Sequence, residues 1–459
     1  MRARGPFVLA AVLCLSAACS DLKVADSGGD GGGPGGNDAA AQSDADVSND
    51  ASTMPGKDSG TDAKAPVTIK VPVIVSAVIA GSISIAVDDT GEAALAWLDT
   101  PSAQRHLHIA RIAGGEEPPR VEVLSDTPLE SNASSLGQAV AAFTPTKGCF
   151  GVLWGQAGAL NVAAVGSDAK PGASSVFATI SAGAVARLSQ VRAAPDDAGG
   201  ALVAWSELAR YGGDASGVFH TGALPFTGCA AGTPSLDADA LSTGTLAYQA
   251  PPAGAPELAL TRTGGVFHAA LQQTVSGTIL GVAHRARAAA TFDAAGSVDD
   301  GGTVTAGGSV GIAGNGANLA IAYYRRTTDT LADLVVATVT PAGVKTGETV
   351  LEHDVLAGVA SNTYLEAARL AVASRTGGSA VIAAVFARDA MTSELRVYRA
   401  DAKAPGGFRS ELVDTNVFGP RGTGDAHPLL DAAVDASGRI HVAWRSGVSK
   451  AITYARLPP

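Results

Sequence analysis

Residues 434–444 read VDASGRIHVAW, and residues 87–97 read VDDTGEAALAW. Both stretches follow one frame, in which Asp, Gly and Ala-Trp stand at the same offsets. A third copy, PDDAGGALVAW, occupies residues 195–205, and a fourth, PTKGCFGVLW at 145–154, keeps the Gly and the Trp but begins with Pro. A frame that recurs along one chain indicates tandem structural units, which decide the fold.

The repeated frame predicts a β-hairpin. Its apolar alternating run leads to Asp and Gly, which favour a tight turn because Asp can bond the following backbone and Gly adopts positive φ without strain. A second alternating run then ends in Ala-Trp. The predicted turn residues are Asp88, Gly91, Asp196, Gly199, Asp435 and Gly438, and the aromatic residues are Trp97, Trp154, Trp205 and Trp444.

A third apolar run follows each hairpin, as in LHIARI at 107–112, LVVATV at 334–339 and ITYARL at 452–457. Each unit therefore offers three strands and room for a fourth, at a spacing of about 55 to 60 residues. Such units predict an all-β fold, a β-propeller of four-stranded blades, because radial packing buries both faces of every blade. Residues 67–459 divide into about seven blades, with six as the alternative because Thr261–Gly308 is hard to assign.

The stretch IHVAW at 440–444 resembles the degenerate repeats of secreted bacterial sialidase-like propellers and related lipoproteins. This resemblance implies the fold but little chemistry, because propellers serve many functions. A sialidase Asp-box has Gly two residues after Asp, whereas here Gly stands three after it. A sialidase would also need three arginines, and nothing in their local sequence selects Arg262, Arg287 and Arg325 for that role.

Other reactive side chains have ordinary structural explanations. His106 and His108 share one face of a strand, but a metal site needs three or four ligands. Asp293, Asp299 and Asp300 could hold calcium, although a solvated acidic turn is the simpler interpretation. The tryptophans could stack on sugars, but we expect them to pack between blades. The sequence thus predicts no cofactor, no metal and no identifiable catalytic residue.

The start of the chain has the pattern of an export signal. Its apolar run FVLAAVLCL at 7–15 suits a signal-peptide core but is too short to span a bilayer. The stretch LSAACS at 15–20 resembles the lipobox of bacterial lipoproteins, although Ser replaces the usual Leu, Val or Ile three residues before the cysteine. The resemblance implies a signal at 1–19, a lipid on Cys19 and outer-membrane sorting through Ser20. Ordinary signal cleavage without a lipid is the alternative.

Residues 20–66 are rich in Gly, Asp, Ala and Ser. Such a segment cannot bury enough apolar surface to offset chain entropy, so we expect a disordered tether that reaches about 40 Å as a flexible coil. The apolar segment Val71–Val87 contains Pro, Gly and Ser, and we interpret it as two short strands rather than a membrane span. Contact with the membrane is therefore expected through the lipid anchor alone.

The charged residues and cysteines limit the partners and the compartment. The net charge is −11 and Lys and Arg are scattered singly, so we expect no nucleic-acid partner. In an exported protein the remaining cysteines, Cys149 and Cys229, are predicted to form a disulfide, with two buried free thiols as the alternative.

Two function classes follow. The first is a monomeric, surface-anchored propeller that binds a protein or a glycan without catalysis, which the absence of a catalytic cluster in the sequence favours. The second is a sialidase-like hydrolase or lyase whose catalytic residues come from different blades and so leave no local motif. Carboxylates and arginines that converge at the propeller axis would favour the second class.

Overall fold

The computed structural model describes the chain in segments. These are residues 67–70, 82–99, 106–115, 121–128, 139–156, 158–166, 172–180, 187–208, 217–237, 258–275, 279–287, 292–293, 296–299, 309–328, 331–356, 369–389, 392–415, 417, 429–446 and 451–459. The expected signal at 1–19, the expected tether at 20–66 and residues 71–81 lie outside these segments. No helix in the described segments is long and apolar enough to cross a membrane.

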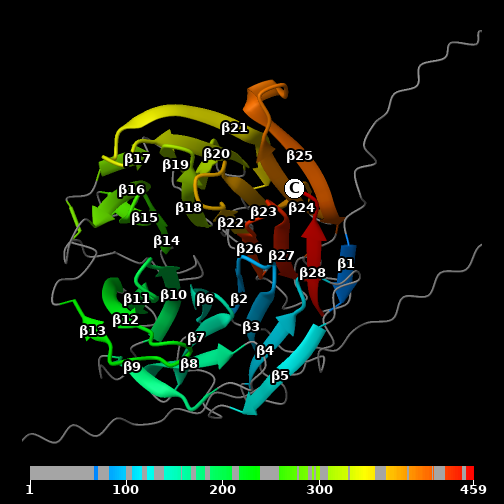
Figure 1. The fold of residues 1–459 in the computed structure, drawn as a ribbon. Helices are drawn as coiled ribbons and strands as arrows, with labels where there is room; N and C mark the ends of the chain where they lie inside the picture. The colour runs from blue at the N-terminus through cyan, green and yellow to red at the C-terminus, as the bar shows by residue number, and fades with distance from the viewer. Residues whose placement is uncertain are drawn as a thin grey trace, which may run out of the picture. The chain divides into compact units, whose positions relative to one another are not determined.

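The described strands form seven antiparallel four-stranded blades arranged around one axis (Figure 1). In chain order, blades 1 to 3 are β2 (Ser82–Val87), β3 (Ala93–Asp99), β4 (His106–Ile112), β5 (Val121–Pro128); β6 (Val140–Thr146), β7 (Cys149–Gln156), β8 (Ala159–Gly166), β9 (Ser175–Thr179); and β10 (Arg187–Pro195), β11 (Gly200–Leu208), β12 (Gly217–Pro225), β13 (Ser235–Leu236). Blades 4 to 6 are β14 (Leu258–Thr263), β15 (Val266–Val275), β16 (Ile279–Arg287), β17 (Gly296–Asp299); β18 (Val310–Asn315), β19 (Asn318–Arg326), β20 (Leu331–Val339), β21 (Lys345–Leu356); and β22 (Arg369–Ala373), β23 (Val381–Ala387), β24 (Ser393–Ala400), β25 (Phe408–Thr415). Blade 7 is β26 (Leu430–Val434), β27 (Ile440–Arg445), β28 (Ile452–Leu457) and β1 (Val67–Lys70).

The ring is closed by strands from the two ends of the described chain. Each innermost strand packs against the innermost strands of both neighbouring blades, including β26 of blade 7 against β2 of blade 1. The outermost strand of blade 7 is β1, which runs antiparallel to β28 with Val67 opposite Arg456 and Lys70 opposite Thr453. Because the N-terminal strand completes the last blade, the first and last blades are held together by backbone hydrogen bonds.

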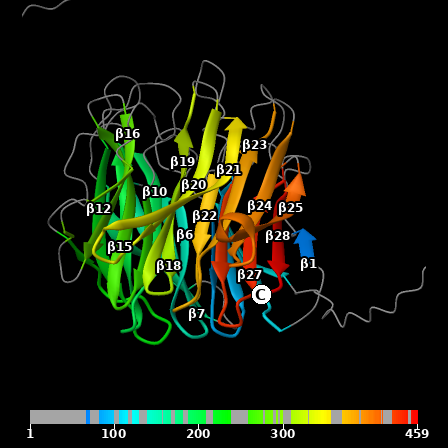
Figure 2. The same cartoon turned by 90° about the horizontal axis from the view of Figure 1, so that it is seen from above.

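The ring has two unlike faces, seen edge-on in Figure 2. One face, called the turn face, carries the connections from first to second and from third to fourth strands, such as 88–92 and 113–120. The opposite face, called the loop face, is where second and fourth strands end and third strands begin, such as Asp99 at the end of β3 and Pro128 at the end of β5. Antiparallel pairing within every blade dictates this division.

Blades 5 and 6 are joined into one eight-stranded sheet, because Leu356 at the end of β21 pairs with Ala387 of β23. Near this junction β21 bulges: Val355 lies opposite Ala332 and Glu352 opposite Leu334, which leaves two residues between them. One of these, Asp354, is the sole non-glycine residue with positive φ (55°) in the described segments. The bulge re-aims the end of β21 toward blade 6.

The predicted seven-bladed, all-β propeller is confirmed, and six blades are excluded. Blade 4 was hard to recognise because its first hairpin turns at Gly264 and Gly265, with neither the Asp nor the Trp of the frame. Of the strands expected in Val71–Val87, the structure describes β2, and the other part lies outside.

Candidate functional site

The recurrent aspartates lie in turns on the turn face. Asp88 Oδ1 accepts hydrogen bonds from the backbone N of Thr90 (2.9 Å) and of Glu92 (3.1 Å). Asp196 accepts from the backbone N of the residues two and four positions on, and Asp435 accepts from the Ser437 hydroxyl and the backbone N of Arg439. The glycines of the three turns have φ between 81° and 86°, which a side chain would strain. These carboxylates are therefore occupied in shaping turns.

The four tryptophans of the frame lie on the second strands of blades 1, 2, 3 and 7 and are between 1% and 5% exposed. Trp205 packs edge-on against Phe177 of the preceding blade, with ring centroids 5.6 Å apart. Trp444 Nε1 donates a hydrogen bond to Asp414 Oδ2, also of the preceding blade (2.7 Å). Rings buried between blades in this way do not offer an open face to a sugar.

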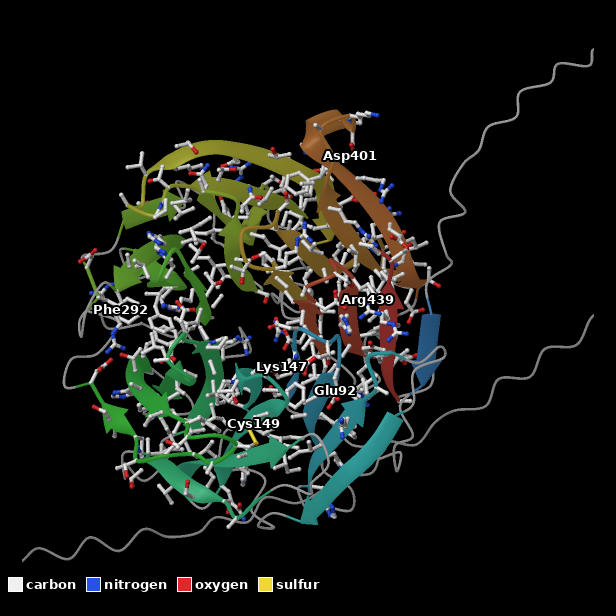
Figure 3. The ribbon with its side chains drawn as sticks, in the orientation of Figure 1. Glu92, Lys147, Cys149, Phe292, Asp401 and Arg439 are labelled. Carbon is white, nitrogen blue, oxygen red and sulfur yellow. A yellow bond between two sulfur atoms is a disulfide. The ribbon has the colours of Figure 1, made fainter. Side chains whose placement is uncertain are left out.

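The predicted disulfide between Cys149 and Cys229 is present, with their Cα atoms 5.4 Å apart (Figure 3). Cys149 begins β7 of blade 2, and Cys229 lies at the exposed tip of the connection between β12 and β13 of blade 3. The bond therefore joins adjacent blades at the turn face.

The three arginines considered for a carboxylate-binding triad are not brought together. Arg262 pairs with Asp197 of blade 3. Arg287 binds both carboxylate oxygens of Asp237, each at 2.8 Å. Arg325 pairs with Glu348 within blade 5 at 2.5 Å. Each guanidinium is held by a different carboxylate at a different place in the ring, so they form no common site.

The histidine pair forms part of an aromatic stack. His108 stacks on Trp97 with centroids 4.9 Å apart, and His106 stacks on His108 at 6.0 Å. Of the aspartates considered for calcium, Asp293 accepts a hydrogen bond at its backbone carbonyl from Arg285 (2.6 Å), and Asp299 pairs with Val282 in the sheet. In the described segments no group of three or more His, Cys, Asp or Glu residues could hold a metal ion.

A buried chain of polar groups lies within blade 7. Asp435 Oδ2 lies 3.3 Å from His441 Nε2, and His441 Nδ1 lies 2.8 Å from the Tyr454 hydroxyl. Burial acts to raise the pKa of Asp435, but hydrogen bonds from His441, Ser437 and the neighbouring Arg439 hold it below its usual value. All three side chains of the chain are at most 2% exposed, so no substrate reaches them.

A tyrosine beside a carboxylate occurs between blades 5 and 6. The Tyr398 hydroxyl donates to Glu352 Oε1 (2.8 Å), and Arg388 bridges Glu352 (2.7 Å) and Glu394 (3.2 Å). A nucleophilic tyrosine would need an accessible hydroxyl with a lowered pKa. Tyr398 is instead 2% exposed, and burial together with the charge of Glu352 raises its pKa. These hydrogen bonds and ion pairs hold blades 5 and 6 together.

Four polar side chains on or beside the innermost strands bridge adjacent blades around the axis. Ser84 Oγ accepts from Ala142 N (3.0 Å), Gln190 Oε1 accepts from Leu258 N (2.8 Å), and Ser309 Oγ donates to the Leu370 carbonyl (3.2 Å). Asp431 Oδ2 accepts from Ile85 N and from Ser84 Oγ, both at 2.9 Å. We call Ser84, Gln190, Ser309 and Asp431 the axial belt. It satisfies backbone groups on strand edges that have no neighbouring strand.

The candidate site is Asp431 of the axial belt, together with Arg192 of blade 3, whose charge acts on the Asp431 carboxyl. Desolvation raises the pKa of the Asp431 carboxyl, while the positive charge of Arg192 and the hydrogen bonds from Ile85 and Ser84 act in the opposite direction. Blades 1 and 2 separate blades 7 and 3 around the ring, so Arg192 acts on Asp431 across the axis. Arg192 forms no ion pair with Asp431 in the described segments, and donors from Ser84, Ile85 and Ala432 hold that carboxyl.

Sequence reasoning missed both residues of this site. Asp431 stands in LDAAV, the strand that precedes the last repeated turn, and Arg192 stands in the equivalent strand of blade 3. Other innermost strands also carry charged residues, such as Arg262 and Arg369, so no local feature of the sequence singled out these two. The interaction of their charges could not be foreseen, because it depends on the closure of the ring.

The strand pairing defines an all-β, seven-bladed β-propeller. No protein-family model and no curated protein matches the chain. Among solved structures it is similar to the lectin of Aleuria aurantia in complex with Fucα1-6GlcNAc (11% identity, 72% of this chain, 95% of the lectin, TM-score 0.42). It is also similar to AofleA from Arthrobotrys oligospora (9%, 76% and 91%, 0.40) and to the α-L-arabinofuranosidase Arb93A from Fusarium graminearum (9%, 86% and 98%, 0.42). Because these TM-scores lie below 0.5, the likenesses carry no argument about function.

Proposed function

We propose that the protein is an exported lipoprotein, anchored through Cys19, whose propeller is a non-enzymatic module that binds a glycan or a protein with its loop face. The observation that carries the binding part is the place where the chain enters the ring. Val67 lies opposite Arg456, at the turn-face end of β1. The chain therefore enters the ring at the turn-face end of β1, and the loop face does not carry this entry point.

The two faces differ in how uniform their connections are in length and composition. Turn-face connections such as 147–148 and 435–439 are short, and the repeated ones are fixed by their own Asp side chains. The loop face receives the connections between blades, which vary in length and composition, as at 237–257, 300–309 and 357–368. Dissimilar segments held on one side of a rigid ring are where recognition residues usually stand.

A glycan array and a protein pull-down with the full chain test the binding role. The connection at 357–368 would be replaced by a Gly-Ser segment of equal length, and the turn-face connection at 340–344 would be replaced in the same way as a control. We expect the loop-face variant to lose at least tenfold in affinity for the bound partner and the control to keep it. A loss of affinity in the control variant but not in the loop-face variant would contradict the proposal. Release of sugar products would show instead that the protein is a hydrolase.

The anchor is tested separately, by labelling cells with an alkyne palmitate analogue. The wild-type chain should take up the label and fractionate with membranes, and Cys19→Ser should do neither. Cys229→Ser is the matched control, because it removes another cysteine and should leave the labelling unchanged. Equal labelling of wild type and Cys19→Ser would exclude the lipid at this position.

A further inference from the structure

Basic side chains gather on the turn face of blades 6 and 7. Arg375 lies in the connection between β22 and β23, Lys403 in the connection between β24 and β25, and Arg409 near the start of β25. All three residues are exposed, and none has a carboxylate partner within ion-pair distance in the described segments. We call Arg375, Lys403 and Arg409 the basic patch.

Contacts between blades 6 and 7 hold the elements of the basic patch at one junction. Arg375 Nη1 donates a hydrogen bond to the Ala436 carbonyl in the turn of blade 7 (3.5 Å). Arg409 lies directly opposite Arg399 in the β24–β25 pair, and Arg399 Nη1 donates to the Pro458 carbonyl, just after β28. Because Ala436 and Pro458 both lie on the turn-face side of blade 7, the exposed cations follow the boundary between the two blades on that face.

The carboxylates of this region do not neutralise the basic patch. Glu411 pairs with Arg399 (3.0 Å), and Asp435 pairs with Arg439 (2.7 Å). Asp401 Oδ1 accepts a hydrogen bond from the backbone of its own connection (2.9 Å). Even with Asp401 counted against the three exposed cations, the junction keeps a positive charge, in a chain whose net charge is −11.

The basic patch extends from near the axis to the rim of the ring. Figure 3 shows Asp401, in the same connection as Lys403, at the outer edge, and Arg439, in the turn that Arg375 contacts, nearer the axis. Cations spread over such a span do not converge on one small anion. They match a surface that presents many phosphate groups, to which guanidinium and ammonium groups donate charge-assisted hydrogen bonds.

The chain enters the ring beside the basic patch. Val67, the first residue of β1, lies opposite Arg456, two residues before the Pro458 that Arg399 contacts. The expected tether at 20–66 would reach about 40 Å as a flexible coil. A surface next to the point where a lipid-bearing tether joins the ring has a high effective concentration at the membrane, so weak electrostatic contacts suffice to hold it there.

We propose that the basic patch docks the propeller onto the anionic headgroups of the membrane that holds its lipid anchor, which leaves the loop face free for its partner. This docking rests on the proposed anchor for its membrane, but the contact itself is electrostatic and does not require the lipid. The protein would then contact the membrane through a folded surface as well as through the lipid, to which the sequence had limited the expected contact.

Vesicle binding by the full chain with Cys19→Ser, which cannot take up the lipid, tests the docking. The probes are vesicles of phosphatidylcholine alone and of phosphatidylcholine mixed with phosphatidylglycerol. We expect at least tenfold tighter binding to the mixed vesicles at low salt, and loss of this difference at high salt, because salt screens exposed charges. Equal binding to both kinds of vesicle would overturn the proposal. Since the variant lacks the lipid, the result is independent of whether Cys19 is acylated.

Further variants in the same background place the contact at the basic patch. Arg375→Gln combined with Arg409→Gln should weaken binding to the mixed vesicles at least tenfold, since each basic residue near an anionic surface contributes about fivefold. Arg375→Lys combined with Arg409→Lys keeps both charges and should stay within about threefold. Lys147→Gln is the control, because it removes an exposed cation from the turn of blade 2, and should change the affinity less than about twofold.

Unchanged affinity in the pair of Gln substitutions, or equal losses in the Gln and Lys pairs, would overturn the assignment to Arg375 and Arg409. If the Gln pair does not fold, as judged by its unfolding midpoint, Lys403→Gln decides. This exposed residue of the same patch should then lose about fivefold in affinity for the mixed vesicles, and an affinity equal to that of Lys147→Gln would overturn the proposal.

Discussion

The hydroxyl of Ser84 in the first blade donates a hydrogen bond of 2.9 Å to Asp431 in the last blade, across 347 residues of sequence. The same Ser84 oxygen accepts a hydrogen bond from Ala142 N of the second blade (3.0 Å). One side chain therefore connects three consecutive blades at the point where the ring closes. Because β1 also pairs with β28 at the outer edge of blade 7, closure is secured both at the axis and at the rim.

Ser84→Ala should lower the free energy of unfolding by about 1 to 3 kcal/mol, because it leaves the buried Ala142 N–H without its acceptor and Asp431 without one of its donors. Urea denaturation followed by tryptophan fluorescence measures the change. Ser175→Ala, at an exposed position of β9, serves as the control and should stay within about 0.5 kcal/mol of wild type. An equal loss in both variants would show that the closure contact contributes nothing specific.

Reduction of the Cys149–Cys229 disulfide should lower the free energy of unfolding by about 4 kcal/mol, because the bond closes a loop with a sequence separation of 80 residues in the unfolded chain. Urea denaturation with and without a phosphine reductant measures the difference. The double variant Cys149→Ala, Cys229→Ala should not respond to the reductant. A wild-type midpoint that is also insensitive to reductant would contradict the prediction.

Trp444→Phe should destabilise the protein more than Trp97→Phe. Both rings are buried to about the same degree, but Trp444 Nε1 donates to Asp414, whereas Trp97 Nε1 has no hydrogen-bond partner in the described segments. The difference should be about 1 to 3 kcal/mol, the usual contribution of a hydrogen bond to a charged group. Paired urea denaturation curves measure it. Equal losses would mean that the indole contributes through packing alone.

Acid should weaken the fold through the buried pair His268 and His284, whose Nδ1 and Nε2 atoms are 3.1 Å apart. Burial, followed by the proximity of His268, lowers the pKa of His284 from 6.5 to about 4, against the opposing charge of Asp293. Because the unfolded chain then binds more protons than the native one, stability is full above about pH 6.5 and falls as the pH drops toward 4. The loss attributable to His284 is at most about 3 kcal/mol.

The pH effect is measured by urea denaturation of wild type and His284→Gln at several pH values between 7 and 4.5. The variant should show a flatter decline with falling pH than wild type. His353→Asn is the control, since that ring is 73% exposed, and its decline should follow wild type. Parallel curves for wild type and His284→Gln would assign the acid sensitivity to other groups.

Local patterns predicted much of the fold. The repeated Asp-to-Gly turn and the following apolar run identify hairpins, because turn chemistry and period-2 alternation act over a few residues. Blade 4 escaped this reasoning because its hairpin turns on Gly264 and Gly265, and Leu271 stands where the other second strands carry the Trp of the frame. The cysteine pairing was predicted from the compartment, since two cysteines remained for an exported domain.

The amino-acid sequence alone was enough to predict repeated β units of three strands with room for a fourth, with turns where Asp and Gly recur and tryptophans packed between blades. The tertiary structure was needed to show that there are seven blades, that β1 closes the ring, and that Asp431 of the last blade binds Ser84 and Ile85 of the first. The physical reason is the distance along the chain over which the interactions act. Hairpins follow from contacts between neighbouring residues. Ring closure and the contacts around the axis depend on the summed rotation of all blades, which no single repeat encodes.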